Sequence, residues 1–214
     1  MKFEDMVNQV ICGDSKKIMR YIPSNSIDLC LTDPPYGANN DKGIGGYGES
    51  KTDRHYKDNW DNERPNKKIF NEILRISKKV IIFGGNFFTD LLPVNACWIV
   101  WDKKGDIAFN NPYGDCELAW TNIDRKSVKK YQVIQQGFVA EEKVRWHPTQ
   151  KPVKLFEMIL IDFSNKGDLI LDPFLGSGTT AVAAKELGRR YIGIEISPEY
   201  YRVSNERLRQ EVLF

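Results

Sequence analysis

The chain has 214 residues, of which 41% are hydrophobic and 28% charged, and this ordinary balance excludes a disordered, collagenous or low-complexity protein. At this length we expect one packed domain that spans residues 1–214. The formal net charge is only +2, so any affinity for nucleic acid depends on local clusters of basic residues.

The first residues, MKFEDMVNQVICGDS, carry acids where a signal peptide would be apolar, and no apolar run approaches the roughly 18 residues of a membrane span. The four cysteines are widely separated and lack a CxxC pair, which argues against a structural zinc site. These features predict a cytoplasmic protein with reduced thiols and with neither a metal nor a membrane as partner.

Apolar runs of strand length alternate with amphipathic stretches, a pattern typical of an α/β fold with a mainly parallel sheet. Several of the runs are apolar on both faces, as buried parallel strands are. The expected strands are 7–12, 27–32, 79–84, 97–102, 116–121, 168–172 and 191–195. The expected helices are 15–22, 66–77, 86–92, 152–164, 178–187 and 198–211.

Two segments interrupt this alternation. Residues 37–64 are rich in glycine and polar residues, and they are too long for an ordinary βα connection of about 2–6 residues, which predicts a functional loop. Residues 122–154 contain eight basic residues against three acidic ones. The sequence therefore predicts a basic stretch that follows the fifth strand.

The first motif with chemical content is LTDPPYG, residues 31–37, where a buried strand meets the long loop. Two prolines fix the backbone and leave the Asp33 and Pro34 carbonyls as rigid acceptors beside the Asp33 carboxylate. Tyr36 adds an aromatic plate. This cluster suits a planar ring with an NH₂ group, although a rigid turn that merely ends a strand is the alternative interpretation.

The second motif is DLILDPFLGSGTTAVAAKELGRRYIGIEIS, residues 168–197. A strand ends at Asp172, a turn with Gly176 and Gly178 lets a ligand approach the backbone, and a helix follows. The next strand ends at Glu195, 17 residues after Gly178. A nucleoside-binding βαβ unit has this order, with the acid on the ribose hydroxyls.

These motifs resemble the amino-methylating DNA methyltransferases that use S-adenosylmethionine. The early catalytic motif and the late cofactor motif resemble the circularly permuted β class. The resemblance covers nearly the whole chain and implies a Rossmann-like methyltransferase fold, a doubly wound, seven-stranded sheet in which the strands ending at Asp33 and Asp172 are neighbours. It lies in DPPYG (33–37), HPTQKP (147–152), DPFLGSGTT (172–180) and GIEIS (193–197).

The resemblance also implies an activity. The DPPY form is similar to the adenine-N6 enzymes, which would transfer the methyl group to the exocyclic amine of an adenine flipped out of double-stranded DNA. The implied catalytic residues are Asp33, Pro34, Pro35 and Tyr36. The implied cofactor-binding residues are Asp14, Thr149, Lys151, Asp172, Phe174, Gly176, Ser177, Gly178, Thr179 and Glu195.

Two alternatives stay open at this point. Cytosine-N4 methylation presents the same kind of amine, although SPPY is commoner there, and a non-catalytic subunit that binds cofactor or DNA is the alternative from another class. Family members usually carry a larger recognition segment than residues 122–146 can provide. We therefore expect residues 37–64 and 122–146 to contact DNA, with a homodimer or a second specificity-bearing subunit as a further source of recognition.

Overall fold

The computed structural model describes residues 1–37, 64–106, 114–135, 146 and 150–210. Residues 38–63 of the long loop, residues 136–145 and Thr149 lie outside this part of the chain, so what the sequence predicts for them stays a prediction. Within the described ranges, no helix combines the length and the apolar character needed to cross a membrane.

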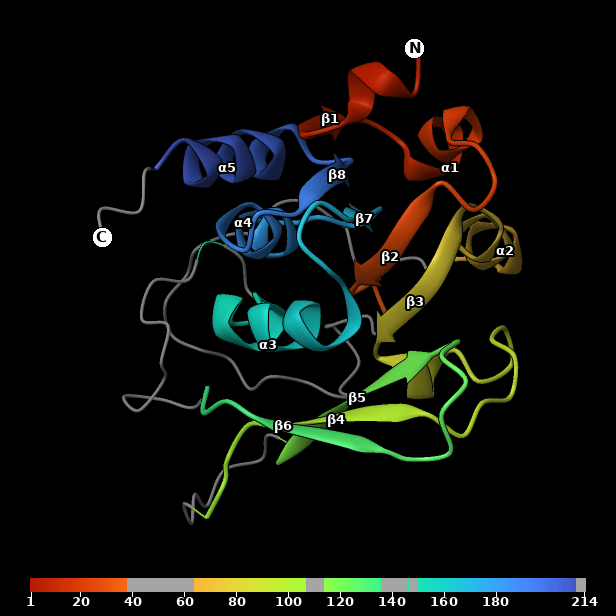
Figure 1. Cartoon of the computed structure of the whole chain (residues 1–214), viewed down its shortest axis with the longest axis vertical. Coiled ribbons are helices and arrows are strands. Elements are labelled where there is room, and N and C mark those ends of the chain that lie inside the picture. The colour runs from red at the N-terminus through yellow and green to blue at the C-terminus, as the bar shows by residue number, and fades with distance from the viewer. Residues whose placement is uncertain (38–63, 107–113, 136–145, 147–149, 211–214) are drawn as a thin grey trace.

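The strands of the described chain form one sheet in the order β1-β8-β7-β2-β3-β5-β4-β6 (Figure 1). Five neighbouring pairs are parallel, and β5 runs antiparallel to both β3 and β4. The predicted α/β fold with a mainly parallel sheet is confirmed. The strands are β1 (Gln9–Cys12), β2 (Ile27–Thr32), β3 (Ser77–Phe83), β4 (Trp98–Asp102), β5 (Cys116–Thr121), β6 (Lys129–Gln132), β7 (Leu169–Asp172) and β8 (Arg190–Glu195).

The sheet has eight strands within the described residues, one more than the expected seven. The additional strand, β6, lies in the basic stretch and pairs in parallel with β4, with Lys130 opposite Val100. Only Tyr131 of its four residues is buried. So short and polar a segment has no recognisable strand pattern, which is why its sequence reads as a connection.

Helices cover both faces of the sheet. Because alternate side chains of a strand point to opposite faces, Leu29 and Leu31 pack with α3 and α4, whereas Cys30 packs with α1 and α2. Figure 1 shows the two groups of helices on opposite sides of the central strands. The architecture is therefore doubly wound. The helices are α1 (Ser15–Ile18), α2 (Lys67–Ile76), α3 (Val153–Phe163), α4 (Thr179–Glu186) and α5 (Pro198–Arg209).

The prediction of a helix at 86–92 is wrong. A single 3₁₀ turn, η4 (Gly85–Phe87), forms there instead and is followed by further turns. Gly84 precedes it with φ of +65°, and its N–H donates to the Leu118 carbonyl at 2.9 Å, which ties this backbone to β5. Gly84 and Gly85 before this segment and Pro93 after it disfavour a longer helix, and Phe88 reaches the core from a turn.

The pairing of β2 with β7 determines where the two sequence motifs meet. Leu29 lies opposite Ile170 and Cys30 opposite Leu171 in a parallel register. Their carboxyl ends consequently reach the same edge of the sheet. From β7 the chain continues to the neighbouring β8, whereas β2 is followed by β3 on its other side, so the crevice between β2 and β7 is the topological switch point where ligands bind in such folds.

Candidate functional site

A cavity of about 260 Å³ opens at the switch point, and we call it the strand-end cavity. Its wall contains residues from the ends of β2, β7 and β8, from the start of α4 and from the segment before α3. Both sequence motifs therefore contribute to one site. Of the predicted site residues, its lining includes Asp14, Asp33, Pro35, Lys151, Asp172, Phe174, Gly176, Ser177, Thr179 and Glu195.

Asp33 lies directly after β2, at the wall of this cavity. One carboxylate oxygen, Oδ1, accepts a hydrogen bond from the Tyr36 hydroxyl at 2.6 Å. The other, Oδ2, forms an ion pair with the ammonium of Lys151. A carboxylate offers about four acceptor positions, so each oxygen retains a lone pair for a further donor such as an amine.

Tyr36 forms part of an aromatic cluster beside Asp33. Its ring stacks on Phe87 with centroids 4.6 Å apart and an interplanar angle of 18°, and Phe87 itself is 45% exposed. On Gly84, a Cβ atom would come within 2.1 Å of the Tyr36 ring, so only glycine permits this approach. The phenol is thereby fixed from both its ring and its hydroxyl. The base-stacking role expected for Tyr36 stays a prediction.

Lys151 links Asp33 to a second carboxylate that the sequence did not indicate. Its ammonium also pairs with Oε2 of Glu117 on β5 at 3.2 Å, and Oε1 of Glu117 pairs with Lys103 at 3.0 Å. The Lys151 side chain is only 7% exposed and lies over the Phe83 ring at 5.6 Å. Four alternating charges thus form one largely buried chain, which we call the charge chain (Asp33, Lys151, Glu117 and Lys103).

The charge chain shifts the pKa of its members. Burial raises the pKa of Asp33, Lys151 lowers it and Glu117 raises it, and the net shift is upward. Burial alone would raise the pKa of Glu117, yet Lys151 and Lys103 hold it below its usual value. Burial alone would lower the pKa of Lys151, but Asp33 and Glu117 more than offset this and raise it. The lysine therefore stays charged between two acids.

Asp172, at the end of β7, connects the two motifs. It is only 4% exposed, and its carboxylate accepts hydrogen bonds from Thr32 of β2 at 2.6 Å, Thr180 of α4 at 2.5 Å and the Phe174 N–H at 3.0 Å. Burial raises its pKa to about 6, although these hydrogen bonds favour the ionised form. These three donors come from β2, α4 and the turn after β7, so the carboxylate connects the elements that carry the two motifs.

The opposite end of the cavity contains Glu195 and Asp14. Glu195 is 8% exposed, and its two oxygens accept the N–H groups of Gly176 at 2.6 Å and Ser197 at 2.8 Å. Burial raises its pKa. Asp14 caps α1 by accepting the Lys16 N–H at 2.9 Å. Each acid is thus oriented by the backbone and keeps further acceptor positions for hydroxyl or amino groups.

The glycine loop (residues 172–179) is also held in place by contacts with α5. Arg207 is 8% exposed and donates to the Ser177 carbonyl at 2.8 Å and to its hydroxyl at 3.1 Å. Gly178 adopts φ of +96°, and a Cβ atom there would come within 2.9 Å of the Ser204 side chain. The loop therefore needs glycine both for its conformation and for its contact with α5.

Sequence reasoning missed Glu117 and Arg207. The buried residues Tyr200, Ser204, Arg207 and Leu208 recur at helical spacing, so this periodicity could have identified Arg207 as an inward-facing charge. Glu117 offered a weaker signal, because one acid in a short strand is usually solvated. Lys151 is predicted to contact the cofactor. In the structure its ammonium also pairs with two carboxylates, those of Asp33 and Glu117.

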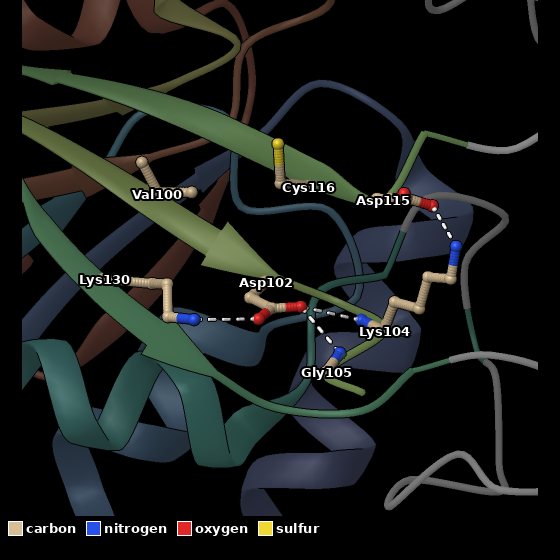
Figure 2. A pocket seen from close by; sticks show the side chains of 7 residues that line it. All are labelled: Val100, Asp102, Lys104, Gly105, Asp115, Cys116 and Lys130. Atoms are coloured by element: carbon tan, nitrogen blue, oxygen red, sulfur yellow. Dashed lines mark hydrogen bonds and ion pairs between the residues drawn. The ribbon is translucent and has the colours of Figure 1, made fainter. Parts of the chain in front are cut away.

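The basic residues of β6 have acidic partners. Lys129 pairs with Asp162 of α3, and Lys130 pairs with Asp102 of β4 at 3.1 Å. Figure 2 shows Lys130 and Asp102 in a second cavity of about 300 Å³ at the outer strands, where Lys104 also pairs with Asp115 at 3.1 Å. Exposed pairs of this kind are worth only about 0–1 kcal/mol, so they do not prevent these lysines from binding other anions.

The chain is similar in sequence to known proteins. Residues 93–206, more than half of the chain, match the family model described as "DNA methylase" (N6_N4_Mtase). Type II methyltransferase M.HpaI of Haemophilus parainfluenzae is 30% identical over 242 residues, which cover 96% of this chain and 76% of that protein.

Solved structures resemble the chain in fold. The crystal structure titled "M1.HpyAVI-SAM complex" has a TM-score of 0.62 at 23% identity and covers 94% of this chain and 99% of its own. The PvuII DNA methyltransferase, whose title describes it as cytosine-N4-specific, has a TM-score of 0.64 at 17% identity and covers 96% of this chain and 88% of its own.

We expect Asp172→Asn to remove a pH dependence of stability. The pKa of Asp172 in the fold, about 6, exceeds its ordinary 3.8, so its contribution to stability is complete below pH 3.8 and is lost as the pH rises through 6. Relative to the variant, the wild type should lose on the order of 3 kcal/mol of unfolding free energy across this window. Urea denaturation at several pH values measures the unfolding free energy of both proteins. The same dependence of this free energy on pH in wild type and variant would contradict the prediction.

Proposed function

The chain belongs to the DNA methylase family, and we propose that it transfers a methyl group from S-adenosylmethionine to the exocyclic N6 of adenine in double-stranded DNA. The observation that carries this proposal is the meeting of Asp33 and Pro35 with the glycine loop at one cavity. Asp33 and Glu195 both line that cavity, and each retains acceptor capacity.

The residues of the cavity fit S-adenosylmethionine. Glu195 would accept hydrogen bonds from the ribose hydroxyls, and Asp14 would accept from the adenine amino group. Gly176, with φ of +56°, supports a close approach of the ligand to the backbone, and Phe174 offers an apolar surface. When bound there, the cofactor supplies an electrophilic methyl group on a sulfonium.

Asp33 is the residue we propose to prepare the target amine. The lone pair of an adenine amine is delocalised into the ring, so the amine must be held and turned toward the methyl donor. Asp33 and the Pro34 carbonyl would accept hydrogen bonds from its two N–H groups and fix its direction. Positioning of this kind can remove about 7–11 kcal/mol from a barrier, whereas general acid–base catalysis typically gives 10²–10⁴-fold, about 3–5 kcal/mol.

Extrusion of the target base from the duplex costs a few kcal/mol. Stacking on an aromatic ring returns about 1–3 kcal/mol per base. The fixed Tyr36 ring and the exposed Phe87 beside it are the surfaces available for this purpose. We propose that residues 37–64 and 122–146 add the contacts to DNA, and that a homodimer or second subunit would complete recognition where these segments are too short.

Cytosine-N4 methylation is the second candidate. Its amine carries two protons that suit the same acceptors, and the PvuII enzyme shares the fold. Asp33 as the first residue of DPPY favours adenine. A subunit without catalysis is less well supported, because Asp33 and Glu195 both face the cavity.

The deciding experiment identifies the methylated base. Purified protein is incubated with methyl-labelled S-adenosylmethionine and unmethylated bacterial DNA, and the nucleosides are separated by mass spectrometry. N6-methyladenine is the expected product. Formation of N4-methylcytosine would support the second candidate instead. The absence of label in DNA would contradict both candidate activities.

Asp33→Ala and Glu195→Ala should separate catalysis from cofactor binding. Asp33→Ala should abolish methyl transfer while cofactor affinity stays within a few fold. Glu195→Ala should weaken cofactor binding by about 1.5–3 kcal/mol, because hydrogen bonds to a charged group are lost. Calorimetric titration and methyl-transfer rates measure the two effects. An active Asp33→Ala protein, or an unchanged affinity in Glu195→Ala, would refute the corresponding role.

Arg207→Ala should weaken cofactor binding, although Arg207 contacts the glycine loop and has no proposed contact with the cofactor itself. The variant loses the hydrogen bonds to the Ser177 carbonyl and hydroxyl, so the loop must become ordered when the cofactor binds. This ordering should reduce the binding free energy by about 1–2 kcal/mol. Arg209→Ala, which removes an exposed arginine from the same helix, is the matched control and should bind as the wild type does. Equal affinities for all three proteins would show that α5 does not support the loop.

A further inference from the structure

The charge chain continues beyond the residues that a target base can touch. Its order is Asp33, Lys151, Glu117 and Lys103, contributed respectively by the end of β2, the segment before α3, β5 and the residue after β4. In the sequence, Asp33 and Lys151 are 118 residues apart. Glu117 is thus linked to the proposed catalytic carboxylate by ion pairs through Lys151, and its charge also acts on that carboxylate.

We propose that Glu117 is a positioning residue for methyl transfer, which holds the Lys151 ammonium between two carboxylates so that Asp33 keeps its place and its strength as a hydrogen-bond acceptor. This inference rests on the proposed function of Asp33. Glu117 itself is not among the residues that line the strand-end cavity.

The geometry supports a shared lysine. The Lys151 ammonium lies 3.2 Å from Oε2 of Glu117 while it also pairs with Oδ2 of Asp33. Lys103 holds the other Glu117 oxygen at 3.0 Å, which fixes the direction of the carboxylate. The side chains of Lys151, Lys103 and Glu117 are 7%, 11% and 22% exposed, so water screens these charges weakly.

Removal of the Glu117 charge has a defined consequence. Lys151 would then have one anionic partner instead of two, and its ammonium would interact more strongly with Asp33. An acceptor engaged in this way attracts the protons of an amine less. The Asp33 carboxylate would also be drawn toward Lys151, and small displacements of catalytic groups can reduce rates by up to about 10²-fold.

The charged and polar groups around Asp33 come from several elements. They are Lys151 before α3, Glu117 on β5, Tyr36 on its own segment and Asp172 at the end of β7, which also senses the Asp33 charge. Glu117 raises the pKa of Asp33, whereas Lys151 lowers it. Replacement of Glu117 by an isosteric neutral residue must therefore lower the pKa of Asp33.

The first test needs neither DNA nor cofactor. The carboxyl carbons of aspartate are labelled with ¹³C, the Asp33 signal is assigned from its loss in Asp33→Asn, and its titration is followed in wild type and Glu117→Gln. Asp33 should titrate at lower pH in Glu117→Gln. Asp115→Asn is the control, because it removes an equal charge two residues earlier from a 68% exposed side chain that pairs with Lys104 (Figure 2). Its Asp33 titration should match the wild type.

The second test is kinetic. Glu117→Gln should lower kcat by about 10- to 100-fold while the KM for S-adenosylmethionine changes by less than about twofold. The acidic limb of its pH–rate profile should move to lower pH, since Asp33 acts in its ionised form. Glu117→Asp, which keeps the charge, should keep the wild-type limb and recover part of kcat.

The outcomes distinguish the inference from the function on which it rests. An unmoved Asp33 titration in folded Glu117→Gln, or a loss of kcat with an unmoved acidic limb, would overturn the inference and leave Asp33 as proposed. A Glu117→Gln protein with wild-type kcat would overturn it as well. Wild-type protein that methylates no DNA would instead contradict the proposed function, and with it the inference.

Discussion

The buried carboxylate of Asp172 is the constraint on which the site depends. A carboxylate removed from water must have its acceptors satisfied, and here the donors are Thr32 at the end of β2, Thr180 in α4 and the Phe174 N–H of the glycine loop. Asp172 therefore joins three elements, one of which contributes Thr32 from 140 positions earlier in the sequence. The segment after β2 and the glycine loop are thereby held in one register, and the cavity between them has a defined shape.

Much of the fold is predictable because its core strands are apolar on both faces. The predicted bounds of β2 and β5 agree with the structure, since a buried strand flanked by polar residues has clear limits. The short polar strand β6 and the turns after Gly84 were missed, because each forms through contacts made elsewhere in the chain. Local pattern contains no information about such contacts.

The residues of the site likewise fall into those that the sequence identifies and those that only the folded chain brings together. Residues 33–36 and the glycine loop are short runs of proline, glycine and polar residues at strand ends, so the sequence alone identifies them as candidates. Glu117 and Lys103 are ordinary charged residues in ordinary places, and only the sheet order brings them to Lys151. Four charges with alternating sign can be buried together because each is paired, whereas any one alone would be costly.

The two halves of the cavity have separate supports. The glycine loop and Glu195 are fixed by α5 and by backbone N–H groups, whereas Asp33 is fixed by Tyr36 and by the charge chain from β5. Among the described residues, Asp172 and Lys151 connect the two halves: Asp172 accepts a hydrogen bond from Thr32, and the Lys151 carbonyl accepts one from Thr179 at 3.2 Å while its ammonium pairs with Asp33. Changes of Glu117 or Lys103 can therefore alter Asp33 while Glu195 and Arg207 continue to hold Gly176 and Ser177.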